Sequence, residues 1–162
     1  MRCAALLLMG LCILPGAARA ADRPDAPMPA AMKVITFFAT PEGGSRFGEV
    51  EIPFALQRDD GLGHVLHLST AYGSPAVQFV DLPAGMNQDW HTAPARQIVV
   101  VLAGTLEVET TDGETRRWRT GDVFLPADVT GKGHRTRCID GAVRVMFAPL
   151  PDGFDATTWT TP

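Results

Sequence analysis

"DWHTAPARQIVVVLAG", residues 89–104, places one histidine, His91, six residues before Gln97, which opens an apolar run. Side chains alternate across a β-strand, so Gln97 faces the same side as Val99 and Val101. The same alternation, extended back through the loop, brings His91 to that side as well. Polar groups that face a core are costly unless they are hydrogen-bonded or used in function. This pair is therefore the first candidate for a functional site.

A second histidine, His134, opens the stretch "HRTRCIDG". Thr136 and Cys138 share one strand face with it, and the two intervening arginines share the other face. Arginine side chains prefer water, so the arginine face points outward and His134 points inward. The two histidines and the glutamine are therefore expected to meet in one cavity.

The strand pattern around these stretches is dense and contains no helical period, which predicts an all-β sandwich or barrel. Asp112-Gly113 predicts a hairpin turn, and Pro53 is expected to end an edge strand. Residues 57–63 are interpreted as a loop, and residues 64–71 are ambiguous. The expected strands cover residues 33–40, 49–56, 76–83 and 121–126, two short strands around Gly104 within 96–110, and a strand, a turn and a strand within 134–150.

The chain of 162 residues is long enough for one compact domain, which is expected to occupy residues 33–150. Residues 1–20 combine a basic start, the apolar run "AALLLMGLCIL" and a small-residue end, "AARA". This pattern predicts a signal peptide and an exported protein, periplasmic or secreted. Residues 21–32 are rich in Ala and Pro and are interpreted as a flexible leader, and residues 151–162 as a C-terminal tail.

The net charge and the number of cysteines limit the partners and the disulfides that the protein can have. Cleavage of residues 1–20 would remove two arginines and no acidic residue, which changes the formal net charge from −4 to −6. A negative chain without a basic patch argues against nucleic acid and, after cleavage, against a membrane surface as partner. Cys138 would then be the only cysteine, so no intrachain disulfide can form. It is interpreted either as a small buried hydrophobe or as a reactive thiol near His134.

The spacing of these residues resembles the cupins, a superfamily of small jelly-roll β-barrels. Gly85 is followed by five residues, then His91-x-Ala93, three residues, Gln97, six residues and Gly104, which matches the first cupin motif. The second motif is similar to "GDVFLPADVTGKGH", which ends at His134. The chain looks most like a subgroup with "WHxAPxxQ" and "TGKGH" motifs. The resemblance implies a single-domain cupin-type jelly-roll β-barrel and a homodimer as a possible assembly.

Two departures from the cupin pattern weaken the usual metal site. The resemblance implies three histidines and a glutamate as ligands, but Ala93 replaces the second histidine and Gln97 replaces the glutamate. An amide is a poor ligand beside a carboxylate. A divalent metal held by His91, His134 and Gln97 would need a further ligand, such as Asp128, so the ligand count favours a cavity without metal. His64 and His67 are alternative further ligands.

Several functions remain open at this point. The leading hypothesis is an enzyme of the isomerase, lyase or hydrolase type that acts on a small molecule. One of the two histidines, His91 or His134, would be the general base, and the other, or Gln97, would orient the substrate oxygen. The alternatives are a metal-dependent cupin enzyme, a small-molecule binding or sensing module without turnover, and an interior in which Gln97 merely bridges the histidines.

Other residues carry smaller expectations. Gly131 and Gly133 are interpreted as turn residues, with an anion site that includes Lys132 as the alternative. Asp128 is expected to be a turn or cap residue. Two tryptophans, Trp90 and Trp118, are expected on the outside of the barrel or at a subunit contact, and Phe154 and Trp159 are expected to dock the tail.

Overall fold

The computed structural model describes residues 30–154, which form ten strands and no helix. The all-β prediction is therefore confirmed. The strands are β1 (Ala31–Ala39), β2 (Ser45–Pro53), β3 (Leu56–Asp59), β4 (Val65–Leu68), β5 (Gln78–Leu82), β6 (Asn87–His91), β7 (Gln97–Glu109), β8 (Thr115–Arg119), β9 (Val123–Ala127) and β10 (His134–Pro149). None of the described residues belongs to a helix that could cross a membrane.

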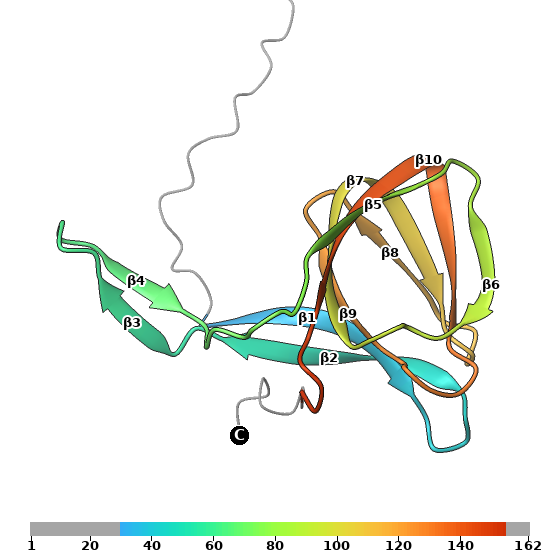
Figure 1. The fold of residues 1–162 in the computed structure, drawn as a ribbon, viewed down its shortest axis with the longest axis horizontal. Helices are drawn as coiled ribbons and strands as arrows, with labels where there is room; N and C mark the ends of the chain where they lie inside the picture. The colour runs from blue at the N-terminus through green and yellow to red at the C-terminus, as the bar shows by residue number, and fades with distance from the viewer. Residues whose placement is uncertain (1–29, 155–162) are drawn as a thin grey trace, which may run out of the picture.

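Eight of the strands form one sheet that wraps into a barrel (Figure 1). The main path runs β2-β1-β9-β7-β10-β5, while β6 pairs with β10 and β8 pairs with β7. β2 lies at one end of this path and stops at Pro53, as expected for an edge strand. The parallel pairing of β1 with β9 is the only parallel contact in the described sheets.

β7 and β10 are each one long strand, which corrects the prediction of two short strands in each region. Both strands bend at the same level of the barrel, where their pairing register shifts between Ile139 and Arg144. Gly104 has a φ of +86° at the bend in β7, and Asp140 and Gly141 also have positive φ. Because of these bends, each strand contributes to two walls of the barrel. The residues that predicted turns therefore mark the bends, where the strands continue without a break.

The N-terminal part of the chain differs from the prediction in two places. β1 begins at Ala31, two residues before the strand that was expected at residues 33–40. Residues 57–63 are only partly a loop, because β3 and β4 form a hairpin that projects away from the barrel (Figure 1). We call residues 56–68 the arm. His64 and His67 lie on it, and His64 Nδ1 is 2.7 Å from the Asp60 carboxylate.

An aromatic cluster fills one end of the barrel interior. Phe37 contacts Phe47, Phe124 and Trp118, with ring centroids 5.8–6.4 Å apart. Trp118 is only 4% exposed, so the prediction that it packs outside the barrel is wrong. It pairs with Leu106 across the β7–β8 ladder and therefore shares the interior face with it. Each such large apolar side chain stabilises the fold by about 1.5–3 kcal/mol through burial.

Trp90 lies between two cations on the outer side of β6 and β10. Lys132 Nζ is 4.4 Å and Arg135 Cζ is 4.7 Å from the centre of its ring. The expectation that Trp90 packs outside the barrel is thus confirmed. Such contacts are worth about 0.5–1 kcal/mol each at exposed positions. They help to hold the loop before β10 against β6.

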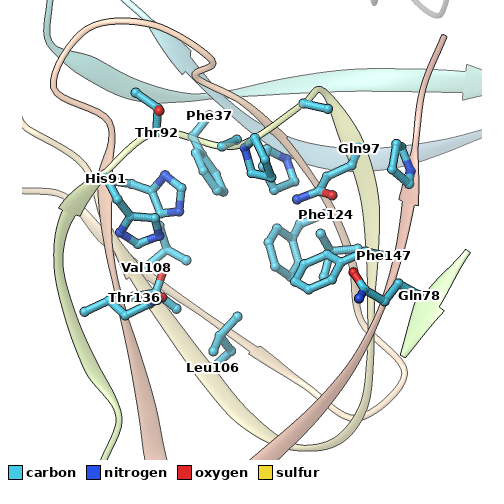
Figure 2. A pocket seen from close by; sticks show the side chains of 18 of the residues that line it. Phe37, Gln78, His91, Thr92, Gln97, Leu106, Val108, Phe124, Thr136 and Phe147 are labelled. Atoms are coloured by element: carbon cyan, nitrogen blue, oxygen red, sulfur yellow. The ribbon is translucent and has the colours of Figure 1, made fainter. Parts of the chain in front are cut away.

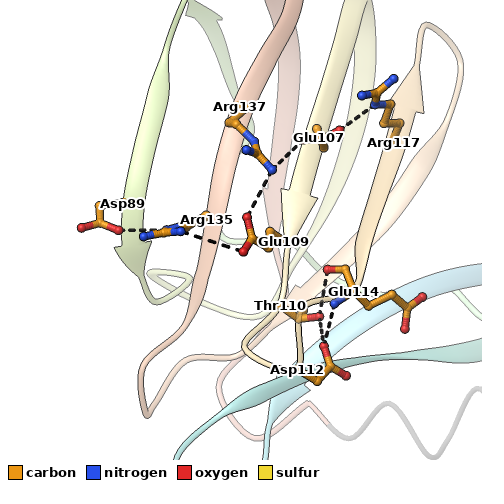
Figure 3. A network of polar contacts seen from close by, with 9 residues as sticks. All are labelled: Asp89, Glu107, Glu109, Thr110, Asp112, Glu114, Arg117, Arg135 and Arg137. Carbon is orange, nitrogen blue, oxygen red and sulfur yellow. Dashed lines mark hydrogen bonds and ion pairs between the residues drawn. The ribbon is translucent and has the colours of Figure 1, made fainter.

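Charged side chains form a ladder across the outer face of β6, β10, β7 and β8 (Figure 3). In the middle of it, the Glu107 carboxylate is 2.7 Å from Arg117 and 2.8 Å from Arg137. At its edge, Asp89 accepts a hydrogen bond from Arg135 at 2.9 Å, which ties β6 to β10. Each exposed ion pair adds little to the stability of the fold, so the main effect of the ladder is to position the strands that it joins. The ladder keeps β6 in place beside the strand that carries His134.

Cys138 belongs to the apolar core, as the first of its two interpretations predicted. Its side chain faces the interior together with His134 and Thr136, and burial raises the pKa of its thiol. A raised pKa lowers the fraction of reactive thiolate. The reactive-thiol interpretation is therefore not supported.

We expect Cys138 to react slowly with a thiol reagent in the folded protein. In a chain that begins at residue 21, which holds no other cysteine, the rate with a disulfide reagent should be about 100-fold lower than in denaturant. The absorbance of the released thiolate measures both rates. Rapid native labelling would contradict the buried placement.

The end of the described chain packs back onto the barrel. Phe154 lies against a second apolar cluster that contains Leu125 and Leu150, and its ring centroid is 5.3 Å from that of Tyr72. Docking of the tail through Phe154 is confirmed. Trp159, the predicted signal peptide and most of the predicted leader lie outside the described residues.

Candidate functional site

A cavity of about 320 Å³ opens inside the barrel (Figure 2). This volume is at the lower end of the range for small-molecule sites. Its walls are mostly apolar, with Phe37, Phe124 and Phe147 as the large aromatic contributions. The polar side chains that line it are those of Gln78, Gln88, His91, Thr92, Gln97, His134 and Thr136. The expected meeting of both histidines and Gln97 in one cavity is confirmed.

The β6–β10 ladder brings the two histidines together, because His91 and His134 are direct partners in its register. Their ring centroids are 4.4 Å apart. Gly133, immediately before His134, has a φ of +78° and packs directly against the backbone of His91. A side chain there would overlap the His91 carbonyl, so the close approach of the loop requires glycine.

Asp128 fixes the orientation of the His134 ring. Its Oδ2 is 2.7 Å from His134 Nδ1, and both side chains are almost completely buried. An ionised carboxylate only accepts hydrogen bonds, so Nδ1 carries the hydrogen and Nε2 is left for the cavity. Phe37 packs against the same ring, with centroids 4.6 Å apart. The other carboxylate oxygen, Oδ1, is buried without a partner among residues 30–154.

This position for Asp128 corrects two expectations. It is a buried partner of a histidine rather than a turn or cap residue at the surface. It also does not line the cavity, so it does not complete a ligand set with His91 and Gln97. The sequence shows only that a carboxylate precedes His134 by six residues. It does not show how the turns between the two residues bring their side chains together.

His91 is held by its own strand. Its Nδ1 donates to the backbone carbonyl of Asp89 at 2.7 Å, since a carbonyl can only accept. The neutral ring therefore carries its hydrogen on Nδ1 and presents an Nε2 lone pair. Neither Nε2, of His91 or of His134, has a hydrogen-bond partner within the described part of the chain. The side of the cavity formed by His91 and His134, which we call the histidine wall, thus presents two hydrogen-bond acceptors.

Gln97 lies on the other side of the cavity from His91 (Figure 2). It begins β7, where it pairs with Pro149 of β10, and is 6% exposed. Its side-chain amide makes no hydrogen bond to any residue in 30–154. The hypothesis that Gln97 bridges the two histidines is therefore wrong. The residue is largely buried, and its amide is unpaired and faces the cavity.

The loop before β10 supports the turn interpretation of its glycines. Gly131 and Gly133 both have positive φ, and the amide of Lys132 donates to the carbonyl of Gly43 at 2.8 Å. That amide is already used, and the Lys132 ammonium lies over Trp90. These contacts favour the turn interpretation, because they use one backbone amide and the lysine charge that the anion-site alternative would need.

The donor set does not fit the metal site that the cupin resemblance implies. The cavity is lined by two imidazoles, two hydroxyls and the amides of Gln78, Gln88 and Gln97, but by no carboxylate or thiol from the described residues, and the carboxylate of Asp128 is engaged behind His134. His64 and His67 lie on the arm and do not reach the cavity. Within residues 30–154, no three His, Cys, Asp or Glu side chains are grouped to hold a metal ion. Metal sites of this kind usually need three protein ligands.

We expect the purified protein, loaded with Fe, Mn, Ni or Zn and then desalted, to retain far less than one equivalent of metal. The double variant Ala93→His and Gln97→Glu restores the residues that the cupin pattern places there. It should retain close to one equivalent, measured by elemental analysis. Stoichiometric metal in the unchanged protein would refute the argument from ligand count.

Sequence reasoning missed part of the cavity wall. Gln78 on β5 and Gln88 on β6 line it, although both are exposed at the residue level. Nothing in the local pattern marks them, because they enter the cavity only through the curvature of the barrel. Thr136 could have been included, since it shares the inward face with His134.

No protein-family model matches the chain, and no curated protein matches it. Solved structures that are similar include DMSP lyase DddQ from Ruegeria pomeroyi DSS-3, at 28% identity and a TM-score of 0.42 over 51% of this chain and 41% of that one. KdgF from Halomonas sp. is similar at 28% identity and a TM-score of 0.34, over 51% and 76% of the two chains.

An RmlC-like cupin from Shewanella frigidimarina NCIMB 400 is similar at 20% identity and a TM-score of 0.34, over 73% of this chain and 95% of that one. The chain spans less than half the length of the DMSP lyase. No activity is transferred from these partial similarities. The wrapped eight-stranded sheet of residues 30–154 and the cavity inside it show that this part of the chain has the cupin-type β-barrel fold.

Proposed function

We propose that this protein binds a small molecule in its barrel cavity and catalyses proton transfer on it, with His134 as the general base. The main support for this proposal is the 2.7 Å contact between the Asp128 carboxylate and His134 Nδ1, which leaves Nε2 of His134 for the cavity. A histidine held by a buried carboxylate is oriented for proton abstraction, and the carboxylate stabilises the imidazolium that forms. The proposal resolves which of the two histidines is the base.

The chemistry can be followed at the level of single atoms. A hydrogen of the ligand, on carbon or oxygen, moves as a proton to Nε2 of His134, and its bonding electrons stay on the ligand. The imidazolium is then balanced by Asp128. The proton returns to a different ligand atom in an isomerisation, or to a leaving group in an elimination. His91 can accept a hydrogen bond from the ligand through its own Nε2, and the Gln97 amide can orient a ligand oxygen.

Hydrogen–deuterium exchange tests this step without knowledge of the natural substrate. We expect the protein to accelerate α-hydrogen exchange of 2-indanone, a small neutral ketone, in deuterated buffer, as measured by NMR. His134→Gln should reduce the protein-dependent rate about 10²- to 10⁴-fold. His91→Gln, which removes a second ring from the same wall, should have a smaller effect.

The outcomes separate the competing functions. Retention of the full rate in His134→Gln would contradict the assignment of the base. Binding of 2-indanone without exchange would favour a binding or sensing module, because such a module needs affinity but no proton transfer. Metal-dependent exchange that a chelator abolishes would favour the metal-dependent alternative.

We further propose that the protein acts after export, on the basis of the apolar signal pattern in residues 1–20. Mass spectrometry of protein recovered from the medium or periplasm should show an N-terminus at Ala21. The homodimer stays a prediction from the resemblance. Light scattering would distinguish it from a monomer, which before cleavage has a mass of 17.4 kDa.

A further inference from the structure

We propose that the cavity selects uncharged ligands that carry a carbonyl or carboxamide at one end and a hydrogen-bond donor at the other. This inference deepens the proposed function, since it concerns the same cavity and rests on that cavity being a ligand site. It assigns Gln97 as the residue that determines specificity at the carbonyl end.

The first support is the absence of formal charge on the cavity wall. None of the side chains that line it, within the described residues, is Asp, Glu, Lys or Arg. A charged ligand would therefore lose its hydration without gaining an ion pair. The one carboxylate nearby, Asp128, lies behind His134, where it would offset a positive charge on that ring. The wall therefore offers no fixed positive charge to an anion.

The second support is the unpaired amide of Gln97. Its residue is more than nine-tenths buried, and its side chain has no hydrogen-bond partner in residues 30–154. An amide that faces a mostly apolar cavity has few partners for its hydrogen bonds, and a ligand that pairs with it supplies them. An amide offers one acceptor and two N–H donors, which a ligand carbonyl or carboxamide complements. An anionic carboxylate would match only the donors, and a cation only the acceptor.

The third support is the opposite wall. His91 and His134 both carry their hydrogen on Nδ1 when neutral, so they present two Nε2 acceptors to the cavity. Such a wall needs an O–H, N–H or acidic C–H from the ligand. Apolar side chains, including Leu106, Phe124 and Phe147, line the space between the two polar ends. The complementary ligand therefore has polar groups at both ends and an apolar middle.

A set of probes of nearly equal shape tests the charge preference. Benzamide, benzoate and benzamidinium differ mainly in net charge, and titration calorimetry at about pH 8 keeps ordinary imidazoles neutral. We expect benzamide to bind at least about 10-fold more tightly than either ion. 4-Hydroxybenzamide should bind more tightly than 4-methoxybenzamide, because only the first can donate to the histidine wall. Equal or tighter binding of an ion, or no binding of benzamide, would overturn the inference.

Substitution of Gln97 tests its assigned role. Gln97→Glu should weaken benzamide binding about 10-fold or more and shift the preference towards benzamidinium. Gln57→Glu on the exposed arm makes the same change in charge away from the cavity and should change neither affinity. Unaltered selectivity in Gln97→Glu would contradict the role of Gln97. If that variant does not fold, the probe series on the unchanged protein still decides the inference.

Failure of this inference can be distinguished from failure of the proposed function. Selective binding of benzamide without exchange of 2-indanone would remove the catalytic proposal and leave the ligand class intact. Exchange that depends on His134, combined with tighter binding of benzoate, would leave catalysis intact and remove the ligand class.

Discussion

The Asp128→Asn variant is expected to lose about 10²- to 10⁴-fold of the protein-dependent exchange rate while it retains ligand binding. Asn has nearly the same shape as Asp, so the packing around His134 should change little. Its amide, however, cannot neutralise an imidazolium, and its N–H₂ group can donate to Nδ1 and force the hydrogen onto Nε2. The first effect makes His134 a weaker base and the second takes its lone pair out of the cavity, and neither removes the ring.

The measurement pairs exchange of 2-indanone with calorimetry of benzamide. A positioning role predicts a large loss in the first and little change in the second, because Asp128 does not line the cavity. The ¹⁵N chemical shifts of His134 would report the change of tautomer directly. An Asp128→Asn protein that exchanges normally, with the hydrogen of His134 still on Nδ1, would show that the buried carboxylate has no role in proton transfer.

Stability gives an independent check on this role. Asp128 is completely buried, and one of its oxygens has no partner in the described part of the chain. A carboxylate in that position is a poor contributor to the fold, because burial of an incompletely paired charge is costly. We therefore expect the free energy of unfolding of Asp128→Asn to change by less than about 1 kcal/mol. A loss of activity without a loss of stability would separate function from folding.

Strand alternation was sufficient to predict most of the site. It placed Gln97 inward beside two valines and His134 inward beside Thr136, and the register of β6 with β10 completes the arrangement. The reasoning succeeded because the side-chain period of a strand is independent of what surrounds it. The spacing of the two motifs predicted the barrel, and the wrapped eight-stranded sheet agrees with it.

The residues that sequence reasoning placed wrongly depend on contacts between distant segments. Asp128 reaches His134 only because the loop between them turns through two glycines with positive φ. Trp118 was expected on the outside of the barrel, yet it is buried, and Arg116 on the same face extends its side chain over Phe47. Long polar side chains can cover an apolar end of a barrel in this way, which local composition does not reveal.

The substitutions at positions 93 and 97 have a common physical effect. Ala93 is buried and lines the cavity without any donor atom, and Gln97 keeps the size of a glutamate but not its charge. Together they leave a cavity wall with hydrogen-bonding capacity and no formal charge. The two residues that depart from the cupin metal pattern are thus also the ones that keep the cavity wall neutral, on which the ligand inference depends.

The Gly133→Ala variant is expected to lose on the order of 3–5 kcal/mol of folding free energy, or to fail to accumulate as folded protein. The φ of +78° alone costs an alanine about 1–2 kcal/mol. The larger part comes from overlap, because the added methyl would collide with the carbonyl of His91 and lie 2.6 Å from the backbone nitrogen of Thr92. Backbone atoms cannot move aside as a flexible side chain would.

Gly113→Ala is the matched control, because Gly113 also has a positive φ, +86°, but an added methyl there meets nothing within 4 Å. Denaturant unfolding should show a loss of about 1–2 kcal/mol for the control and a clearly larger loss for Gly133→Ala. Equal losses would mean that β6 can move away from the loop. In that case the two histidines would separate, so benzamide binding in a folded Gly133→Ala protein would show whether their close approach is needed to form the site.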